Sequence, residues 1–198
     1  IIKAKDYMAK AKRVGGDGAV VHFHFEIGEA WTVPGTVFTP HDVKETTILI
    51  ADNGRNKQAA TVTELLNEGH RVVAVDPFFF GESKIKSRDF LHVILMHAVG
   101  ERALGVQSGQ LAAIANWAKK EFQDPVQLKS VGPRLSVAAR IAAVQTDAIS
   151  SLNLYEPMKS LKSVVLENKG ANHLPEMMCF GLLEFFDLED IERLKAAK

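Results

Sequence analysis

Two histidines on one predicted strand are the first candidates for metal chemistry. Residues 19–27 alternate in polarity, and His22 and His24 therefore point to the same face of a strand. Two imidazoles can bind a metal ion, but zinc sites take three or four ligands. No third ligand follows at a recognisable spacing, so we interpret both as solvent-facing histidines and expect no metal or other cofactor.

A second candidate is Asp76, which ends a buried strand at residues 71–76. In dinucleotide-binding folds an acidic residue at such a position holds a ribose. That function requires a glycine-rich turn after the preceding strand, and residues 52–57 contain only Gly54. We therefore predict that Asp76 caps its own loop. The adjacent Phe78-Phe79-Phe80 run could line an acyl or sugar pocket, but core packing is the default for three phenylalanines.

The composition indicates a globular chain with enough apolar residues for a core. It has 198 residues, of which 46% are hydrophobic and 24% charged, and 24 basic residues balance 24 acidic ones. A chain with no net charge and no basic run gives no electrostatic reason to expect nucleic acid or an anionic membrane as partner. Cys179 is the only cysteine, which excludes an intrachain disulfide and fits a reducing compartment without requiring one. The sequence therefore assigns no compartment or oligomeric state.

The elements that must position any site follow two sequence patterns, one of an antiparallel hairpin and one of alternating strands and helices. Residues 1–18 are predicted to form a helix over 1–13 and a glycine-rich linker, and residues 19–198 the main domain. Residues 19–27 and 31–39 form an antiparallel hairpin. Four apolar runs then alternate with helical stretches, which is typical of parallel strands joined by helices. The strands are expected at 46–51, 71–75, 126–131 and 148–154, and helices at 58–68, 104–122, 137–144, 161–168 and 188–197. We expect the third of these strands to lie centrally, beside the first.

This order of elements resembles the first half of an α/β-hydrolase. More narrowly, residues 33–40 (VPGTVFTP) and 80–83 (FGES) are similar to bacterial acetyl xylan esterases and related carbohydrate esterases. The resemblance implies an α/β fold: a mostly parallel sheet with helices on both faces and an antiparallel hairpin at its start. It also implies carboxylic ester hydrolysis, with a small-molecule or carbohydrate ester as substrate.

The family's nucleophile sits on a sharp turn with the pattern G-x-S-x-G after the third parallel strand. Here the corresponding residues are Gly132-Pro133-Arg134-Leu135-Ser136. Arg134 therefore occupies the nucleophile position, and a guanidinium stays protonated and cannot attack a carbonyl. Ser136 could be a displaced nucleophile, but an N-cap or first-turn serine of the next helix is the favoured interpretation. If Arg134 keeps the strained turn, a salt bridge or a bound anion in the cleft should offset the cost of the strain. If the turn is relaxed and Arg134 points into solvent, it is a relic.

The resemblance also locates an oxyanion hole. One N–H comes from the residue after the nucleophile, here Leu135, and another from the loop after the first parallel strand, here around Asn53 and Gly54. Both donors belong to the backbone and survive changes of side chain. An ordinary loop is an equal alternative.

The acid and histidine of the family's triad should follow the nucleophile in that order. His173 is the only histidine downstream of the elbow, and it precedes the expected acid, so it does not match. We expect the last strands and two catalytic loops to be missing from this chain. Two hypotheses follow: an esterase-related domain that is degenerate or incomplete at its active site, or a non-catalytic ligand-binding or scaffold module on the same fold.

Overall fold

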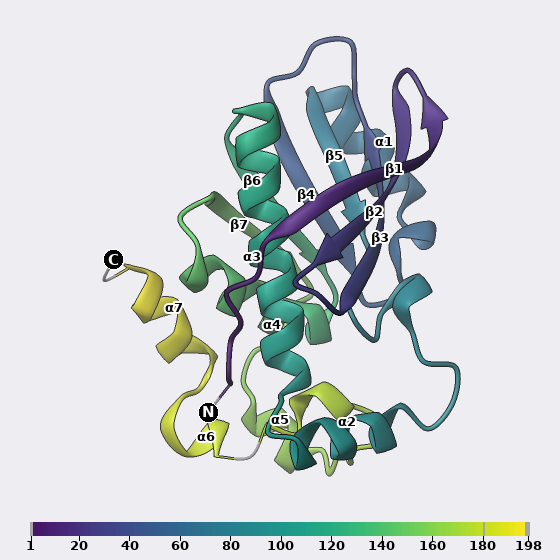
Figure 1. The fold of residues 1–198 in the computed structure, drawn as a ribbon. Coiled ribbons are helices and arrows are strands. Elements are labelled where there is room, and N and C mark those ends of the chain that lie inside the picture. The colour runs from purple at the N-terminus through teal and green to yellow at the C-terminus, as the bar shows by residue number, and fades with distance from the viewer. Residues whose placement is uncertain (1, 180, 197–198) are drawn as a thin grey trace.

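The computed structural model describes residues 2–179 and 181–196. Its centre is a seven-stranded sheet in the order β1-β2-β3-β5-β4-β6-β7 (Figure 1). The strands are β1 (Ala9–Asp17), β2 (Val20–Ile27), β3 (Trp31–Phe38), β4 (Glu45–Ala51), β5 (His70–Val75), β6 (Val126–Val131) and β7 (Ile149–Tyr155). The first three run antiparallel to their neighbours, and β3 also pairs antiparallel with β5. The other pairs are parallel.

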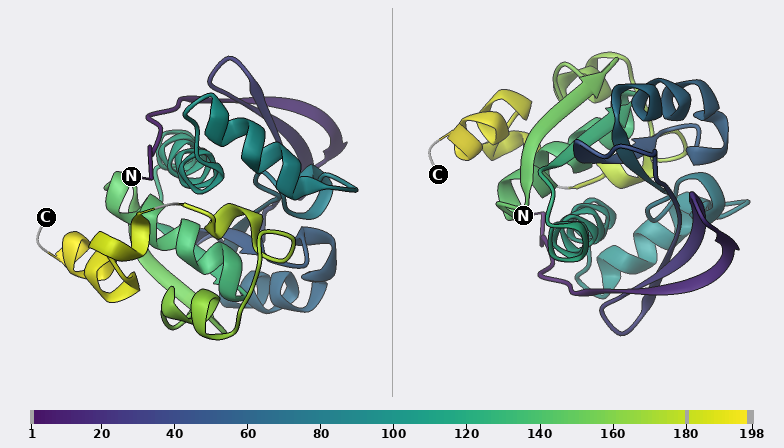
Figure 2. Two further views of the ribbon diagram at one scale, coloured as in Figure 1. Left: turned by 90° about the horizontal axis from the view of Figure 1, so that it is seen from below. Right: turned by 90° about the horizontal axis from the view of Figure 1, so that it is seen from above.

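The helices lie on both faces of this sheet. They are α1 (Ala59–Glu68), α2 (Asp89–Ala98), α3 (Ala103–Phe122), α4 (Pro133–Gln145), α5 (Lys162–Leu166), α6 (Leu182–Phe185) and α7 (Leu188–Ala196). Three short 3₁₀ turns add η1 (Arg55–Lys57), η2 (Gly81–Ser83) and η3 (Pro175–Met177). Figures 1 and 2 show α3 and α4 side by side on one face and α1 on the other.

Two hydrophobic clusters hold these layers together. The larger one packs α3 and α4 against the sheet, with Ile48, Leu111 and Leu128 fully buried. The smaller one lies under α1, where Leu65 packs with Val72. Buried apolar area of this kind is the main favourable term in folding. In the part of the chain that the structure describes, no helix is both long and apolar enough to cross a membrane.

The predicted parallel strands are confirmed, as is the hairpin of β2 and β3. The strand at 126–131 does pair with the strand at 46–51. Its predicted central position is wrong, because only β7 separates β6 from the edge of the sheet. The helix after β4 ends as expected, with Gly69 in the left-handed conformation at a φ of 89°.

The helix predicted for residues 1–13 is wrong within the described residues. Residues 9–17 instead form β1, an edge strand paired with β2. Ala9 and Ala11 pack against the core, whereas Lys10 and Lys12 are exposed on the opposite face of the strand. The alternation was present in the sequence, but the high helix propensity of alanine and lysine masked it. The division of the chain at residue 18 stays a prediction.

Candidate functional site

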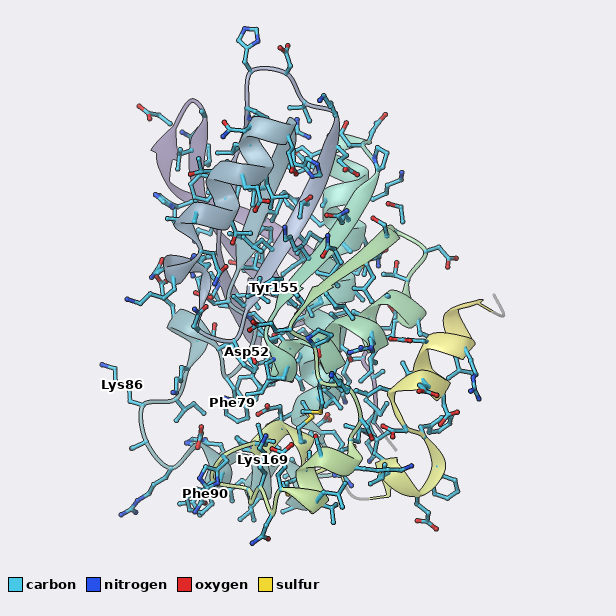
Figure 3. The ribbon with its side chains drawn as sticks, turned by 180° about the vertical axis from the view of Figure 1, so that it is seen from behind. Asp52, Phe79, Lys86, Phe90, Tyr155 and Lys169 are labelled. Carbon is cyan, nitrogen blue, oxygen red and sulfur yellow. The ribbon has the colours of Figure 1, made fainter. Side chains whose placement is uncertain are left out.

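The loops that follow β4, β5, β6 and β7 meet at one edge of the sheet. In Figure 3, Asp52 after β4, Phe79 after β5 and Tyr155 at the end of β7 lie together at this edge. The carboxyl ends of parallel strands are where open α/β sheets carry their ligand sites. The elbow after β6 belongs to the same edge.

The elbow turn itself is made by a glycine. Gly132 has a φ of 104° and is the N-cap of α4, which begins at Pro133. Arg134 is the second residue of this helix and is not among the residues with positive φ. The predicted helix at 137–144 is therefore four residues longer at its start. A nucleophile elbow would hold the backbone of its central residue in a strained conformation. The backbone of Arg134 is helical and does not carry this strain.

The amino terminus of α4 is filled by the carboxylate of Asp52. The N–H of Arg134 donates to Asp52 Oδ2 and the N–H of Leu135 donates to Oδ1, each at 2.8 Å. A carboxylate at a helix N-terminus satisfies unpaired N–H groups and interacts favourably with the helix dipole. The backbone donor that the sequence assigned to an oxyanion hole thus binds an internal anion in this structure.

Asp52 is held in a partly buried place. Burial raises the pKa of its carboxyl above the usual value, and the hydrogen bonds from Leu135 and Arg134 oppose this rise without cancelling it. Glycine at position 132 makes room for the carboxylate, because a Cβ there would lie 2.6 Å from Asp52 Cγ. The contact between Asp52 and the start of α4 therefore depends on the Asp52 carboxylate and on the absence of a side chain at Gly132.

The Arg134 side chain forms a two-point ion pair with Glu176. Its Nε and Nη2 donate to the two carboxylate oxygens of Glu176, each at 2.6 Å. The Glu176 side chain is fully buried and that of Arg134 is 22% exposed. The guanidinium also lies 4.7 Å from the centre of the Phe80 ring. Burial lowers the pKa of Arg134, but the bonded Glu176 carboxylate outweighs it and raises the pKa, so the charge is fixed.

The structure combines one part of each alternative set out for Arg134, because the salt bridge predicted for a strained turn occurs on a relaxed one. The turn is relaxed, yet the guanidinium does not point into solvent. Its charge is neutralised by the Glu176 carboxylate, whose two oxygens each accept one N–H of the guanidinium. An anion from solution would have to compete with Glu176 for the same nitrogens.

Ser136 lies in the first turn of α4, not at the N-cap, which is Gly132. Its Oγ donates to the carbonyl of Pro133 at 2.7 Å and accepts the N–H of Met158 at 3.1 Å. Arg140 Nη1 lies 3.2 Å from the same oxygen. The serine is fully buried. These bonds join α4 to the segment after β7, and a catalytic role for Ser136 stays a prediction.

The two loop residues assigned to the oxyanion hole, Asn53 and Gly54, form hydrogen bonds with neighbours in the sequence. The N–H of Gly54 donates to the carbonyl of Ala51 at 2.9 Å. The side-chain oxygen of Asn53 accepts a hydrogen bond from Gln58 at 2.8 Å. The structure therefore brings the N–H groups of Leu135 and Arg134 together around Asp52. The hydrogen bonds of the Asn53 side chain and the Gly54 N–H are local.

Asp76 ties the loops after β4 and β5 to each other. Its buried carboxylate forms an ion pair with Arg55 and accepts the N–H groups of Arg55 at 2.8 Å and Glu82 at 3.1 Å. Ser83 Oγ donates to the Asp76 carbonyl at 2.8 Å. Arg55 also pairs with Glu82, and this hydrogen bond lowers the pKa of the Glu82 carboxyl. The loop-capping role predicted for Asp76 agrees with these bonds.

The histidines considered as candidates lie on separate elements, β2 and the loop after α5. His22 Nδ1 lies 3.0 Å from Thr36 Oγ1 on the neighbouring strand. His173 is exposed on the loop between α5 and η3. No group of three or more metal-ligating side chains is found among residues 2–179 and 181–196. Phe79 and Phe80 are buried in the core, as their default interpretation predicted.

A cavity of ≈ 340 Å³ opens beside α1. Phe38, Arg55 and Leu66 are among its lining residues, and Asp52, Arg134 and Leu135 are not. The hollow therefore lies away from the elbow, and the groups expected to do chemistry do not face it.

Sequence reasoning missed two residues that organise this site. Asp52 follows a buried strand, as Asp76 does, and this position was a usable signal. The loop was considered only for its backbone donors. Glu176 stands in a Pro-Glu-Met turn without periodicity, and nothing local marks it as the partner of a residue 42 positions away.

No family model and no curated protein matches the sequence. Solved structures do match the fold. A candidate acetyl xylan esterase from Bacteroides fragilis aligns with a TM-score of 0.58 at 13% identity, over 76% of this chain and 48% of that one. A thermostable carboxyl esterase from Bacillus coagulans aligns with a TM-score of 0.54 at 16% identity, over 82% and 56%. A cold-adapted esterase from an Arctic intertidal metagenomic library gives 0.53 at 17%, over 79% and 68%.

The chain spans about half the length of the first two of these structures. At such low identity the likeness concerns the arrangement of strands and helices, and the activities in those names belong to those proteins. The antiparallel start and the parallel strands β4 to β7 are consistent with this arrangement. The chain has an α/β-hydrolase-type fold.

Proposed function

We propose that this chain is a non-hydrolytic α/β-hydrolase-type module with a binding or scaffold role. One observation carries the proposal: the groups at the elbow are all engaged inside the protein. Asp52 binds the N–H groups of Arg134 and Leu135, and Glu176 binds the guanidinium of Arg134.

Serine-dependent ester hydrolysis needs an exposed hydroxyl, a base within hydrogen-bond reach and free donors for the oxyanion. The hydroxyl nearest the elbow, that of Ser136, is buried and hydrogen-bonded on both sides. A carboxylate at the two N–H groups also repels the negative oxygen that develops on an ester carbonyl. The related esterase fold supports an origin in ester chemistry, and a carbohydrate ester stays the ligand class that the resemblance suggests.

Two assays test the absence of hydrolysis. The chain is expected to hydrolyse p-nitrophenyl acetate no faster than buffer and to resist labelling by a fluorophosphonate probe. Loss of a nucleophile lowers the rate by several orders of magnitude, so these assays can separate an active protein from an inactive one. Ser136→Ala is the informative variant, and Ser87→Ala, which alters an exposed loop serine, is the matched control. Labelling that disappears in Ser136→Ala and persists in Ser87→Ala would overturn the proposal.

A thermal-shift titration with acetate and phosphate tests anion binding at Arg134. Because Glu176 neutralises this arginine, neither anion is expected to raise Tm. The Glu176→Gln variant removes the internal carboxylate charge and is expected to create an anion effect. An anion-dependent rise of Tm in the parent protein, absent in Arg134→Ala, would instead show that the arginine serves an anionic ligand.

A further inference from the structure

The outer side of α2 carries an apolar stripe that nothing in the described structure covers. The inner side buries Val93, which is 2% exposed, whereas Leu95 is 64% and Val99 77% exposed. Leu91 and Ile94 are exposed as well. The spacing 91, 94, 95 and then 98, 99 places these side chains on one face of the helix. A helix in a soluble domain normally turns such a face toward the core.

The position of α2 makes this stripe an outward-facing surface. α2 packs against η3, the turn that carries Glu176. Figures 1 and 2 show α2 at the end of the molecule beyond the carboxyl edge of the sheet. α5 lies at the same end and exposes Val165 and Leu166.

Basic residues flank the stripe. Lys84, Lys86 and Arg88 are exposed on the loop that enters α2. Among the ion pairs of the described residues, none involves any of the three. Asp89 is the one acidic residue between positions 84 and 99, so three positive charges minus one negative leave this segment at +2 with neutral histidines. Lys86 projects away from the body of the molecule (Figure 3).

We propose that α2 and the loop at 84–88 form a docking face for an anionic lipid surface. An amphipathic helix with an apolar stripe and adjacent lysine and arginine residues lies in the headgroup region of a bilayer, where apolar burial and charge attraction add. The zero net charge of the whole chain had argued against such a partner, but lipid charge acts within about a Debye length, roughly 8–10 Å. The local charge of this face, and not the net charge of the whole chain, therefore determines whether it attracts an anionic lipid surface.

A second copy of the chain fits this face less well. Pairing two copies of the stripe would bring two sets of unpaired basic residues together, and like charges oppose association. An anionic lipid surface neutralises them and accepts the apolar side chains. This inference does not depend on whether the elbow is catalytic.

Vesicle co-sedimentation of the full chain tests the proposal. We compare vesicles of phosphatidylcholine alone with vesicles that contain about 30 mol% phosphatidylserine, a leaflet charge of the kind that attracts polybasic segments. The chain is expected to bind the anionic vesicles and to lose most of this binding at about 0.5 M salt. No binding, or equal binding to both kinds of vesicle, would overturn the proposal.

Variants identify the face. The triple change Lys84→Gln, Lys86→Gln and Arg88→Gln is expected to weaken partitioning on the order of 100-fold. Ile94→Ser with Leu95→Ser is expected to weaken it at least about tenfold through lost apolar burial. The controls are Lys12→Gln and Val14→Ser on the β1–β2 hairpin, at the opposite end of the molecule (Figure 1).

Circular dichroism of each variant checks that a loss of binding is not caused by unfolding. Binding that falls equally in the control variants would contradict the assignment of the face. A dimer in sedimentation velocity that Ile94→Ser abolishes, with no vesicle binding in the parent protein, would show self-association and overturn the lipid partner.

Discussion

The Asp52 carboxylate accepts the backbone N–H of Leu135 at 2.8 Å, across 83 residues of sequence. The sequence resemblance predicts an oxyanion donor at this N–H, and in the structure the N–H binds an internal carboxylate instead.

Asp52→Asn is expected to change how stability depends on pH. Burial raises the pKa of Asp52 in the folded state, so the folded protein holds this proton to higher pH than the unfolded chain does. The contribution of Asp52 is therefore complete below the unfolded value near 3.8 and is lost as pH rises through the folded value. The difference in unfolding free energy, parent minus Asp52→Asn, should fall from pH 3 toward pH 7, as urea titrations at each pH would measure. A difference that rises with pH would contradict the prediction.

Arg134→Met is expected to destabilise the fold by about 3–5 kcal/mol, because it leaves the fully buried Glu176 carboxylate without its partner. Adding Glu176→Met should recover most of this loss, since two packed apolar side chains can replace a buried pair. The double-mutant cycle is measured by chemical denaturation. Arg193→Met removes an exposed pair with Glu189 and should cost less than about 1 kcal/mol. Additive single effects would show that the two residues are not coupled.

Gly132→Ala is expected to cost about 1–3 kcal/mol from its backbone conformation alone, since φ is 104°. The new Cβ would also meet Asp52, so the total in the parent protein should exceed the cost measured in an Asp52→Ala background. Gly170→Ala is the matched control, because its Cβ meets no atom within 4 Å. Equal costs of Gly132→Ala in both backgrounds would mean that Asp52 does not contact the turn.

Asp187→Ala is expected to lower stability by about 1–2 kcal/mol through the loss of a helix cap. Asp187 Oδ1 accepts the N–H groups of Leu188, at the start of α7, and of Leu161, each at 2.8 Å. Burial would raise the pKa of Asp187, but hydrogen bonds from Ser160, Leu161 and Leu188 outweigh it and lower the pKa. Its stabilisation is therefore present above the unfolded value of 3.8 and is lost as pH falls through the folded value. In thermal melts from pH 2 to 6, the Tm values of the parent and the variant should converge in acid, which is the opposite of the trend expected for Asp52. Tm values that diverge in acid would contradict this prediction.

The sequence by itself determined the parallel strands, their pairing around 46–51 and 126–131, and the glycine turn before α4. These features depend on local patterns, because a buried strand needs a continuous apolar run and a turn at positive φ needs glycine. The resemblance also predicted that Arg134 stands where related sequences carry a serine. Sequence reasoning failed for β1, where alternation competed with helix propensity, and it did not predict α2, whose apolar residues face outward.

Only the tertiary structure decided what the elbow contacts. Asp52 and Glu176 reach Arg134 from positions 82 and 42 residues away, and no local pattern records such a pairing. A buried charge must find a partner, since an isolated ion is expelled from a low-dielectric interior. Which partner it finds depends on how β4, β6 and the η3 turn come together in space. That packing places the Asp52 carboxylate on the N–H groups of Arg134 and Leu135, and the Glu176 carboxylate on the Arg134 guanidinium.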